Sequence, residues 1–531
     1  MRGSWQAIRS RRVAQQHLDR LSAVDAAFLH QEGPTTHMHI GGVIVIEGPA
    51  PPFVELREHV RSRLPLVPRY RQKLAAPPFG LGRQLWVDDP AFNLDYHLRH
   101  TALPRPGGDD ALRRLVGRLF AQRLDRTKPL WELWYVEGLS GGRTALISKT
   151  HHALVDGISG VDLATVLFDL QPEPRPVEAT DVWQPRPEPT AAELAAASLR
   201  SAASSPLRAL GRAPRELSEA RAALEGLGEV VWAGLNPPPD TPLNVRIGSH
   251  RRFEVAAARL SEFKEVKNAF GGTVNDVVLA VVAGALQRWF HARGLRTEGL
   301  ELRAAVPVSL RTSDERGALG NRLTQLVAPL PVGMRDPVLR LKRVSEAMDG
   351  VKDSKQALGA EVIAGAQDFA PPTLLAQASR LNFSTRFYNL LVTNVPGPQL
   401  PLYVLGRRVE GVFPVPFLAG DRALAIAVMS YDGGMGFGLL GDLDAMPDLV
   451  VVAKGIDDAL AELVALARGE APPKPKPARK RAPRRATVQP EEEPAPLRFP
   501  AKPRAGGPAA ALRESARHGH GRHNGAPKTT T

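Results

Sequence analysis

A Pro-rich segment separates two parts of the chain that share the same mixed pattern of helices and strands. Residues 172–189 read PEPRPVEATDVWQPRPEP, and prolines at this density break both helices and strands. The Ala-rich residues 191–235 favour helix and predict a long crossover, which the prolines of residues 236–242 end. Helices interleaved with strands on both sides of this linker predict an α/β fold with two layered subdomains.

The linker divides the chain into five predicted regions. They are an N-terminal extension (1–20), a first subdomain (21–171), a linker and crossover (172–242), a second subdomain (243–468) and a C-terminal tail (469–531). With 531 residues the chain is also longer than one hydrophobic core usually organises.

Apolar periodicity predicts the main elements of both subdomains. In the first, residues 21–29 form a short entry segment that leads to Glu32, and Asp109 and Asp110 cap a helix. The apolar face of that helix consists of Leu112, Leu115, Val116, Leu119 and Phe120. The other helices are predicted at residues 55–64, 158–170, 260–270 and 273–292. Strands are predicted at residues 40–47, 131–136, 144–150, 302–308, 323–330, 387–394, 423–430 and 434–440.

The strand at residues 144–150 leads directly into the sequence H-H-A-L-V-D-G, which runs from His151 to Gly157. Successive side chains of a strand point to opposite faces, so only one of the two histidines can address a given site. Gly157 suits a tight turn into the next helix. We include Asp156 in the predicted site with a structural role, holding this turn or pairing with an arginine.

This arrangement suits the removal of a proton from a hydroxyl group. An alcohol is a poor nucleophile near neutral pH, whereas imidazole, with an ordinary pKa near ~6.5, is largely a free base there. With a thioester as the acyl donor, the thiolate leaves readily and no covalent enzyme intermediate is required. We therefore predict that His152 is the general base and that His151 supports it.

A metal site and a purely structural pair are the alternative roles of these two histidines. A metal site is not expected, because no H-E-x-x-H sequence or second cluster of ligands lies nearby. A buried, hydrogen-bonded position is the usual role of a lone histidine, but the four matching positions of the motif favour catalysis.

Asn275 and Asp276 open the second long helix of the second subdomain. Thr273 and Asp276 resemble a capping box, so a structural role is predicted for Asp276. The amide of Asn275 is free either to donate a hydrogen bond to a developing oxyanion or to fill a packing position.

Several segments together resemble the bacterial wax ester synthase/diacylglycerol acyltransferase family, within the superfamily marked by H-H-x-x-x-D-G. The histidine motif alone identifies only the superfamily, which includes condensation domains and chloramphenicol-type acetyltransferases. The further matches span residues 21–466 in the family's order. They are L-S-A-V-D-A-A-F-L with Glu32 and Met38-His39, P-L-W at 129–131, N-D at 275–276, P-V-S-L-R at 307–311, G-N at 320–321 and N-V-P-G-P at 394–398.

This resemblance implies two chloramphenicol-acetyltransferase-like subdomains joined by a long crossover, with a substrate tunnel between them. Acyl-CoA, as a co-substrate rather than a cofactor, and diacylglycerol or a fatty alcohol would meet at His152, and no cofactor is expected. Triacylglycerol or wax ester synthesis, and with it glycerol metabolism, would follow. The P-L-W segment is expected to be architectural, with Trp131 in the tunnel wall, N-V-P-G-P to form a rigid turn, and Glu32 to help shape the site.

Two alternative functions stay open from the sequence. A carrier-dependent condensation enzyme would be accompanied by adenylation or carrier segments, and none is present in these 531 residues. A catalytically inactive lipid-binding homologue would not need the complete set of motifs.

The net charge of +14 is concentrated in the tail, where residues 472–531 hold 14 Lys and Arg against 4 Asp and Glu, a difference of +10. A Pro-rich tail with few large apolar residues is expected to be disordered and solvated. Its basic run also suits adhesion to anionic lipid head groups. Because the remaining chain is only mildly basic, no nucleic-acid partner is expected.

Composition also indicates where the protein works. The chain has no cysteine, which excludes disulfides and thiolate nucleophiles and fits a cytosolic compartment. No apolar run approaches the ~20 residues that span a bilayer, and the basic N-terminus lacks the apolar core of a signal peptide. We expect a cytoplasmic protein, peripheral at the inner membrane surface or at lipid inclusions.

Overall fold

The computed structural model describes residues 18–80, 82–155, 166–174, 183–210, 236–309, 323–353 and 387–471. All of them belong to one compact unit, residues 1–475, and the second unit, residues 476–531, lies outside the described part. The predictions for the N-terminal extension and for the charged tail therefore remain predictions.

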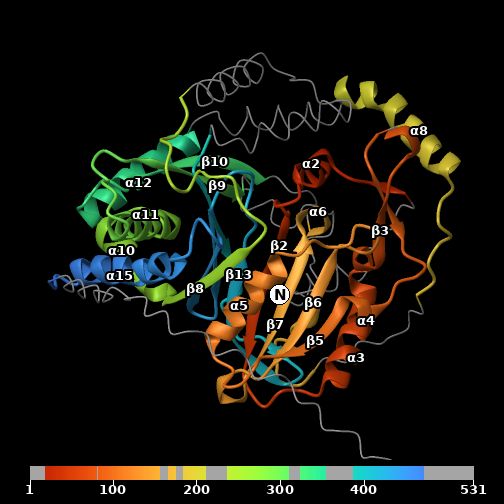
Figure 1. The fold of residues 1–531 in the computed structure, drawn as a ribbon, viewed down its shortest axis with the longest axis horizontal. Coiled ribbons are helices and arrows are strands. Elements are labelled where there is room, and N and C mark those ends of the chain that lie inside the picture. The colour runs from red at the N-terminus through yellow and green to blue at the C-terminus, as the bar shows by residue number, and fades with distance from the viewer. Residues whose placement is uncertain are drawn as a thin grey trace, which may run out of the picture. The chain divides into compact units, whose positions relative to one another are not determined.

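The first six-stranded sheet contains the strand that leads into the histidine motif (Figure 1). Its centre is an antiparallel ladder in which β7 lies between β2 and β6. The strands, in spatial order, are β12 (Tyr403–Val404), β13 (Arg407–Val415), β2 (His39–Ile46), β7 (Thr144–His151), β6 (Trp131–Glu137) and β5 (Leu98–Ala102).

The second six-stranded sheet is mixed, because β11 is parallel to both β9 and β14 while the other pairs are antiparallel. Its strands, in spatial order, are β10 (Leu323–Leu330), β9 (Leu302–Ser309), β11 (Leu390–Pro396), β14 (Leu424–Tyr431), β15 (Gly434–Asp442) and β8 (Arg251–Arg259).

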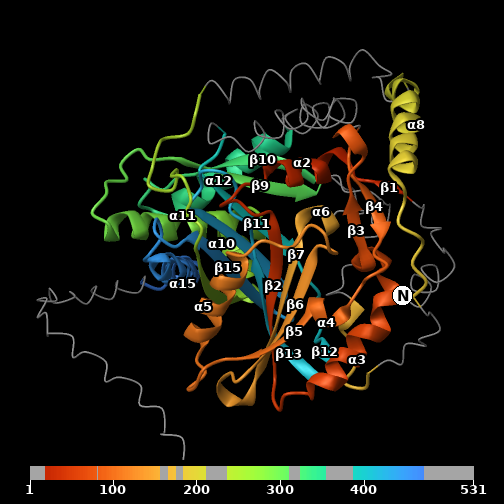
Figure 2. The ribbon, with the colours of Figure 1, turned by 45° about the vertical axis from the view of Figure 1, so that its right-hand side comes forward.

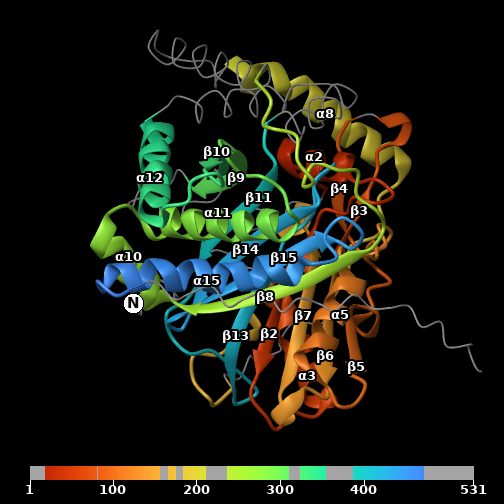
Figure 3. The same ribbon diagram turned by 60° about the vertical axis from the view of Figure 1, so that its left-hand side comes forward.

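Four helices cover one face of the second sheet and bury a large apolar core with it. Figure 3 shows α11 and α15 running side by side across β14 and β15. The helices are α10 (Leu260–Phe270), α11 (Val274–Ala292), α12 (Pro337–Asp353) and α15 (Leu449–Ala467). Of the 19 residues of α11, 14 are buried, which explains its largely apolar sequence.

Strand β13 connects the two parts of the fold, because it comes from the C-terminal half of the chain but pairs with β2 of the first sheet. It also contacts β14 and β15 of the second sheet. Gly438 on β15 makes this approach possible, since a Cβ there would overlap the carbonyl oxygen of Pro414 on β13. The sequence did not predict β13, so the segment 403–415 was placed with the second subdomain although it completes the first sheet.

Helix α5 (Asp109–Phe120) packs between the sheets, against β8. All five predicted apolar side chains are buried, which confirms its amphipathic face. The predicted cap was wrong, because Gly108 is the N-cap and Asp109 and Asp110 lie inside the first turn.

Smaller elements cover the other face of the first sheet and one end of it (Figure 2). They are α2 (Ala23–Gln31), α3 (Phe53–Arg63), α4 (Leu94–His97) and a three-stranded sheet of β1 (Asp19–Arg20), β4 (Leu85–Asp88) and β3 (Gln72–Ala75). Helix α8 (Ala191–Leu210) lies beside this small sheet and contacts residues Pro78–Gly80.

Most element predictions agree with the structure. Helix α10 has the predicted bounds, α11 ends at the predicted residue, and β10 matches its predicted strand. Most of the predicted entry segment at residues 21–29 forms α2, which ends directly before Glu32. The N-V-P-G-P block was wrongly predicted as a turn throughout, because β11 continues to Pro396. The crossover helix is described only to Leu210, and most of the predicted helix at 158–170 lies outside the described residues.

Among the described residues, no single helix is long and apolar enough to cross a bilayer; α10 and α11 pass such a test only as a pair, bent by 99°.

Candidate active site

The histidine motif is anchored where β7 ends and the short helix α6 (His152–Val155) begins. The backbone N–H of His151 donates to the carbonyl of Leu130 (3.0 Å), and that of His152 donates to the carbonyl of Met38 (2.8 Å). Leu130 belongs to the P-L-W segment and Met38 to the N-terminal signature. Two motifs that are distant in sequence therefore hold the histidine pair from both sides.

The two histidines face different surroundings, as predicted, although only His151 lies in β7 and His152 begins α6. His151 is 1% exposed, and its Nδ1 accepts a hydrogen bond from the Ala153 backbone N–H (3.1 Å). A ring nitrogen that accepts carries no proton, so in the neutral ring Nε2 carries it. That nitrogen lies 3.3 Å from the Oε1 atom of Glu32.

The ring of His152 lies between two aromatic rings. It stacks on Phe28 of α2, with centroids 3.9 Å apart, and meets the edge of Phe417 at 5.8 Å. Burial lowers the pKa of His152 to about 4, and the neighbouring His151 adds to this effect. The imidazole is therefore uncharged at neutral pH, the form that a general base requires.

Glu32 occupies the centre of a buried polar cluster. Its carboxylate accepts a hydrogen bond from the Met38 backbone N–H (3.2 Å) and lies 3.5 Å from Nε2 of His39. Burial opposes its ionisation, but His151, His39 and Arg126 hold the pKa of Glu32 well below its ordinary value. The Glu32 carboxylate therefore stays charged next to Nε2 of His151.

The cluster contains two more histidines, and burial keeps both of them neutral. It lowers the pKa of His37 to about 4 and that of His39 well below its ordinary value. The rings of His37 and His39 stack at 5.5 Å. Within the described part of the chain, no group of three or more potential ligands is arranged to hold a metal ion.

Asn275 and Asp276 lie where α11 begins. Thr273 and Asp276 form the predicted capping box, since each side chain accepts the other residue's backbone N–H (3.2 and 2.7 Å). Asn394 of β11 donates its amide to Oδ1 of Asn275 at 3.3 Å, which joins the N-D and N-V-P-G-P motifs. No hydrogen bond or ring contact between described residues joins Asn275 to either histidine of the motif.

Asp156 lies outside the described residues, as does the turn at Gly157. The structural role predicted for Asp156 therefore stays a prediction.

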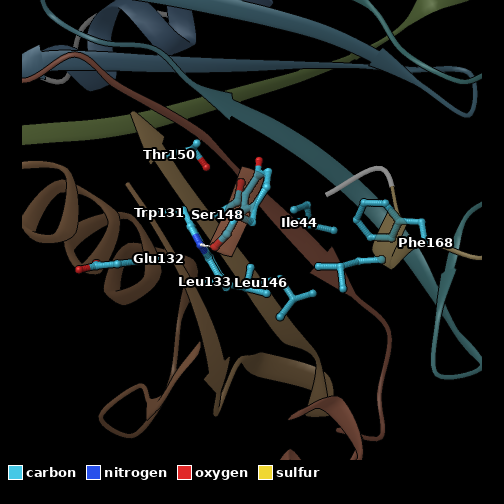
Figure 4. Close-up of a pocket in the computed structure, with 10 residues that line it drawn as sticks. Ile44, Trp131, Glu132, Leu133, Leu146, Ser148, Thr150 and Phe168 are labelled. Carbon is cyan, nitrogen blue, oxygen red and sulfur yellow. Dashed lines mark hydrogen bonds between the residues drawn. The ribbon is translucent and has the colours of Figure 1, made fainter. Parts of the chain in front are cut away.

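Trp131 of the P-L-W segment is fixed by three contacts. Its Nε1–H donates to the carbonyl of Tyr70 (2.7 Å), its ring stacks on His97 (4.6 Å), and its backbone pairs with Thr150. Trp131 lines a pocket on the face of the first sheet that Ser148 and Thr150 share (Figure 4). The other lining residues are Ile44, Tyr70, Glu132, Leu133, Leu146, Leu167 and Phe168. The tunnel between the subdomains that the resemblance implies stays a prediction.

Phe417 and Arg126 contribute to this site but were not predicted. Neither belongs to a motif, and each reaches the site from a distant part of the chain, so no local signal could have found them.

Two family models match most of the chain. The wax ester synthase/diacylglycerol acyltransferase catalytic domain matches residues 21–278, and the C-terminal domain of the same family matches residues 319–464. A probable diacylglycerol O-acyltransferase of Mycobacterium tuberculosis is 34% identical over 467 residues, which cover 85% of this chain and 97% of that protein. A second one from the same species is 35% identical over 84% of this chain and 99% of its own length.

Solved structures agree with these matches. The wax ester synthase/diacylglycerol acyltransferase from Marinobacter aquaeolei VT8 has a TM-score of 0.61 and 28% identity, over 85% of this chain and all of that one. The first condensation domain of the CDA synthetase, at 18% identity and a TM-score of 0.52 over 85% of this chain and 97% of its own, shares the fold. The chain is therefore an acyltransferase that belongs to the wax ester synthase/diacylglycerol acyltransferase family, with the predicted α/β fold.

Proposed function

We propose that the protein transfers a fatty-acyl group from acyl-CoA to the hydroxyl group of diacylglycerol or of a long-chain fatty alcohol. Its membership of the family and its relatives named as diacylglycerol O-acyltransferases support this activity. The products would be triacylglycerol or a wax ester, together with free CoA. Acyl-CoA is a co-substrate here, and the reaction requires no resident cofactor.

In the proposed reaction His152 removes the proton of the acceptor hydroxyl as its oxygen attacks the thioester carbonyl. The new C–O bond forms a tetrahedral intermediate, which collapses as the C–S bond breaks. The CoA thiolate leaves and takes the proton from His152. The chain has no cysteine to form a thioester with the enzyme, so direct transfer between the two substrates is the simplest mechanism.

One observation carries this proposal, the state and setting of the His152 ring. Burial against Phe28 and Phe417 keeps it uncharged at neutral pH, and a hydroxyl can then give up its proton to it. Nδ1 of His152 is buried without a hydrogen-bond partner on another described residue. His151 is placed to support this ring from the strand end, and Asn275 is the candidate amide donor for the oxyanion.

Purified protein with palmitoyl-CoA and either dioleoylglycerol or hexadecanol tests the activity, with CoA release and ester formation as readouts. The variant His152→Ala is expected to lose about 10²–10⁴-fold in turnover, the usual contribution of a general base. His250→Ala, at an exposed position, is the matched control. Full turnover by a folded His152→Ala variant would reject the assignment.

The acceptor is best identified by competition. Dioleoylglycerol and hexadecanol offered together report the ratio of the two values of kcat/KM, which is what an enzyme uses to discriminate substrates. Either ratio fits the general-base mechanism.

We also propose that the protein is cytoplasmic and works at the inner membrane surface or at lipid inclusions. The tail supports this, because residues 472–531 carry a difference of +10 between basic and acidic residues and suit anionic head groups. Deleting residues 472–531 is expected to weaken co-sedimentation with phosphatidylglycerol vesicles and to leave turnover of soluble substrates unchanged. Equal co-sedimentation of both proteins would contradict this role.

A further inference from the structure

The loop of residues 121–129, between α5 and β6, contacts three elements of the candidate site although it carries no recognised motif before Pro129. On β7, Nζ of the buried Lys149 donates to the carbonyl of Gln122 (2.7 Å). On β2, Nε2 of His39 accepts the backbone N–H of Leu124 (3.4 Å). On α2, Arg126 reaches both Leu29 and Glu32.

The contacts of Arg126 are the strongest of the three. Its Nε and Nη2 atoms lie 3.0 and 2.5 Å from Oε2 of Glu32, and Nη2 also donates to the carbonyl of Leu29 at 2.8 Å. Two charged donors on this one oxygen hold it in place and favour the ionised carboxylate. The Leu29 carbonyl belongs to the last turn of α2, where a basic side chain completes the helix end.

Each partner of Arg126 leads to the ring of His152 by one short path. Leu29 follows Phe28, whose ring stacks on His152. Glu32 accepts the backbone N–H of Met38, and the carbonyl of Met38 accepts the backbone N–H of His152. Glu32 also lies 3.3 Å from Nε2 of His151. The Phe28 ring that stacks on His152 and the Met38 carbonyl that accepts its backbone N–H therefore both depend on the guanidinium group of Arg126.

We propose that Arg126 is a positioning residue for the catalytic centre, which fixes Leu29 and Glu32 so that Phe28 and Met38 hold the ring of His152 in place. It does not touch the reacting atoms. This inference rests on the proposed function, because it takes His152 as the group that performs the chemistry.

Three variants separate geometry from charge. Arg126→Gln removes the charge and the two-pronged contact, whereas Arg126→Lys keeps the charge but cannot reproduce the fork. Arg57→Gln is the matched control, because Arg57 makes a similar two-contact pair with Asp95 (2.5 and 3.0 Å) at an exposed position away from the site.

Arg126→Gln is expected to lower kcat by up to about a hundredfold, the cost of a small misplacement of a reacting group, with little change in KM. The acid limb of the kcat profile is expected to move to higher pH, because Arg126 lowers the pKa of Glu32 and a protonated Glu32 no longer holds Met38 and His151 beside His152. Arg126→Lys is expected to restore the acid limb but only part of kcat. A general loss of folded protein would lower kcat without moving the limb.

Hydrogen exchange gives a readout that does not depend on turnover. A peptide that contains residues 151–155 is expected to exchange faster in Arg126→Gln, because the His152 N–H loses its fixed acceptor, and to exchange normally in Arg57→Gln. Unchanged kcat and unchanged exchange in Arg126→Gln would overturn the proposal. If Arg126→Gln does not fold, Arg126→Lys decides. A native acid limb with a lowered kcat supports the proposal, and a native kcat contradicts it. If the native protein forms no ester, the proposed function fails, and the exchange comparison still tests the positioning role of Arg126.

Discussion

The chemistry of the site depends on how the fold keeps one imidazole uncharged. His152 sits between Phe28 and Phe417, and burial brings its pKa to about 4. A lower pKa makes the ring a weaker base, but it ensures that the ring is free of a proton at neutral pH. The acid limb of activity that belongs to His152 is therefore expected well below the ordinary histidine pKa.

Removing the stacked ring tests this relation. Phe28→Ala admits water to the His152 ring, so the pKa of His152 is expected to rise toward about 6.5, the ordinary value. The acid limb of the kcat profile should move upward with it, and kcat should fall as the ring loses its fixed orientation. Profiles measured between pH 4 and pH 8 would show the shift.

Phe53→Ala is the control for Phe28→Ala. Phe53 stacks on His100 with ring centroids 4.6 Å apart, so the substitution Phe53→Ala removes the same kind of ring pair at a place away from the candidate site. An acid limb that stays in place in Phe28→Ala, or that moves equally in both variants, would contradict the role given to Phe28.

At the residue scale, the sequence predicted those features of the site that depend on neighbours in the chain. The different surroundings predicted for His151 and His152 were confirmed, and the spacing of Thr273 and Asp276 correctly predicted a capping box. The contact between Arg126 and Glu32 joins residues 94 positions apart, so no local pattern could reveal it.

At the scale of elements, two motifs meet where α11 begins and β11 ends. Asn394 donates to Oδ1 of Asn275 at 3.3 Å, which fixes the carbonyl side of that amide. That contact uses the carbonyl oxygen of the Asn275 amide and leaves its N–H groups for another acceptor. A side chain fixed in this way suits a donor to an oxyanion, since such donors act through fixed geometry.

Asn275→Ala is expected to reduce kcat by about 10²–10³-fold if its amide donates to the oxyanion, as in other acyl transfers. Asn394→Ala should reduce kcat less, because it removes only the group that orients the donor. Steady-state kinetics and thermal unfolding of both variants separate the roles. Equal losses of stability with unchanged kcat would assign Asn275 to packing alone.

The elements predicted best are those whose ends are set locally. Gly271 and Gly272 separate α10 from α11, and a capping box opens α11. The helix ends predicted from the sequence therefore agree with those of the structure. Strand β13 was missed because its sequence contains Gly411 and Pro414, which are unfavourable in a strand interior, and because its pairing with β2 has a bulge near Gly411.

At the scale of the molecule, the first sheet and its surroundings bury several histidines in the uncharged form. Burial lowers the pKa values of His37, His97 and His152 to about 4 and that of His39 well below its ordinary value. In the unfolded chain these rings regain the ordinary pKa of about 6.5. Between these values the unfolded chain binds more protons than the folded one, so stability falls as the pH falls.

Asp25 acts in the opposite direction. Burial raises the pKa of this carboxyl group to about 6, against 3.8 for the exposed group. Between those values the folded chain binds the extra proton, so acidification stabilises the fold through Asp25. The four histidines take up more protons on unfolding than Asp25 releases. From these five groups alone, unfolding at pH 5 should take up roughly three protons.

The free energy of unfolding is therefore expected to decrease from pH 7 to pH 5, with a slope near pH 5 of about 4 kcal/mol per pH unit for three protons. Urea unfolding at several pH values measures this slope. In His97→Gln the slope should be shallower, because unfolding takes up about one proton fewer. In Asp25→Asn the slope should be steeper, because unfolding takes up about one proton more. Because the two variants are expected to change the slope in opposite directions, a general loss of stability cannot imitate both. A slope near zero between pH 7 and pH 5 would contradict the net proton uptake expected from these groups.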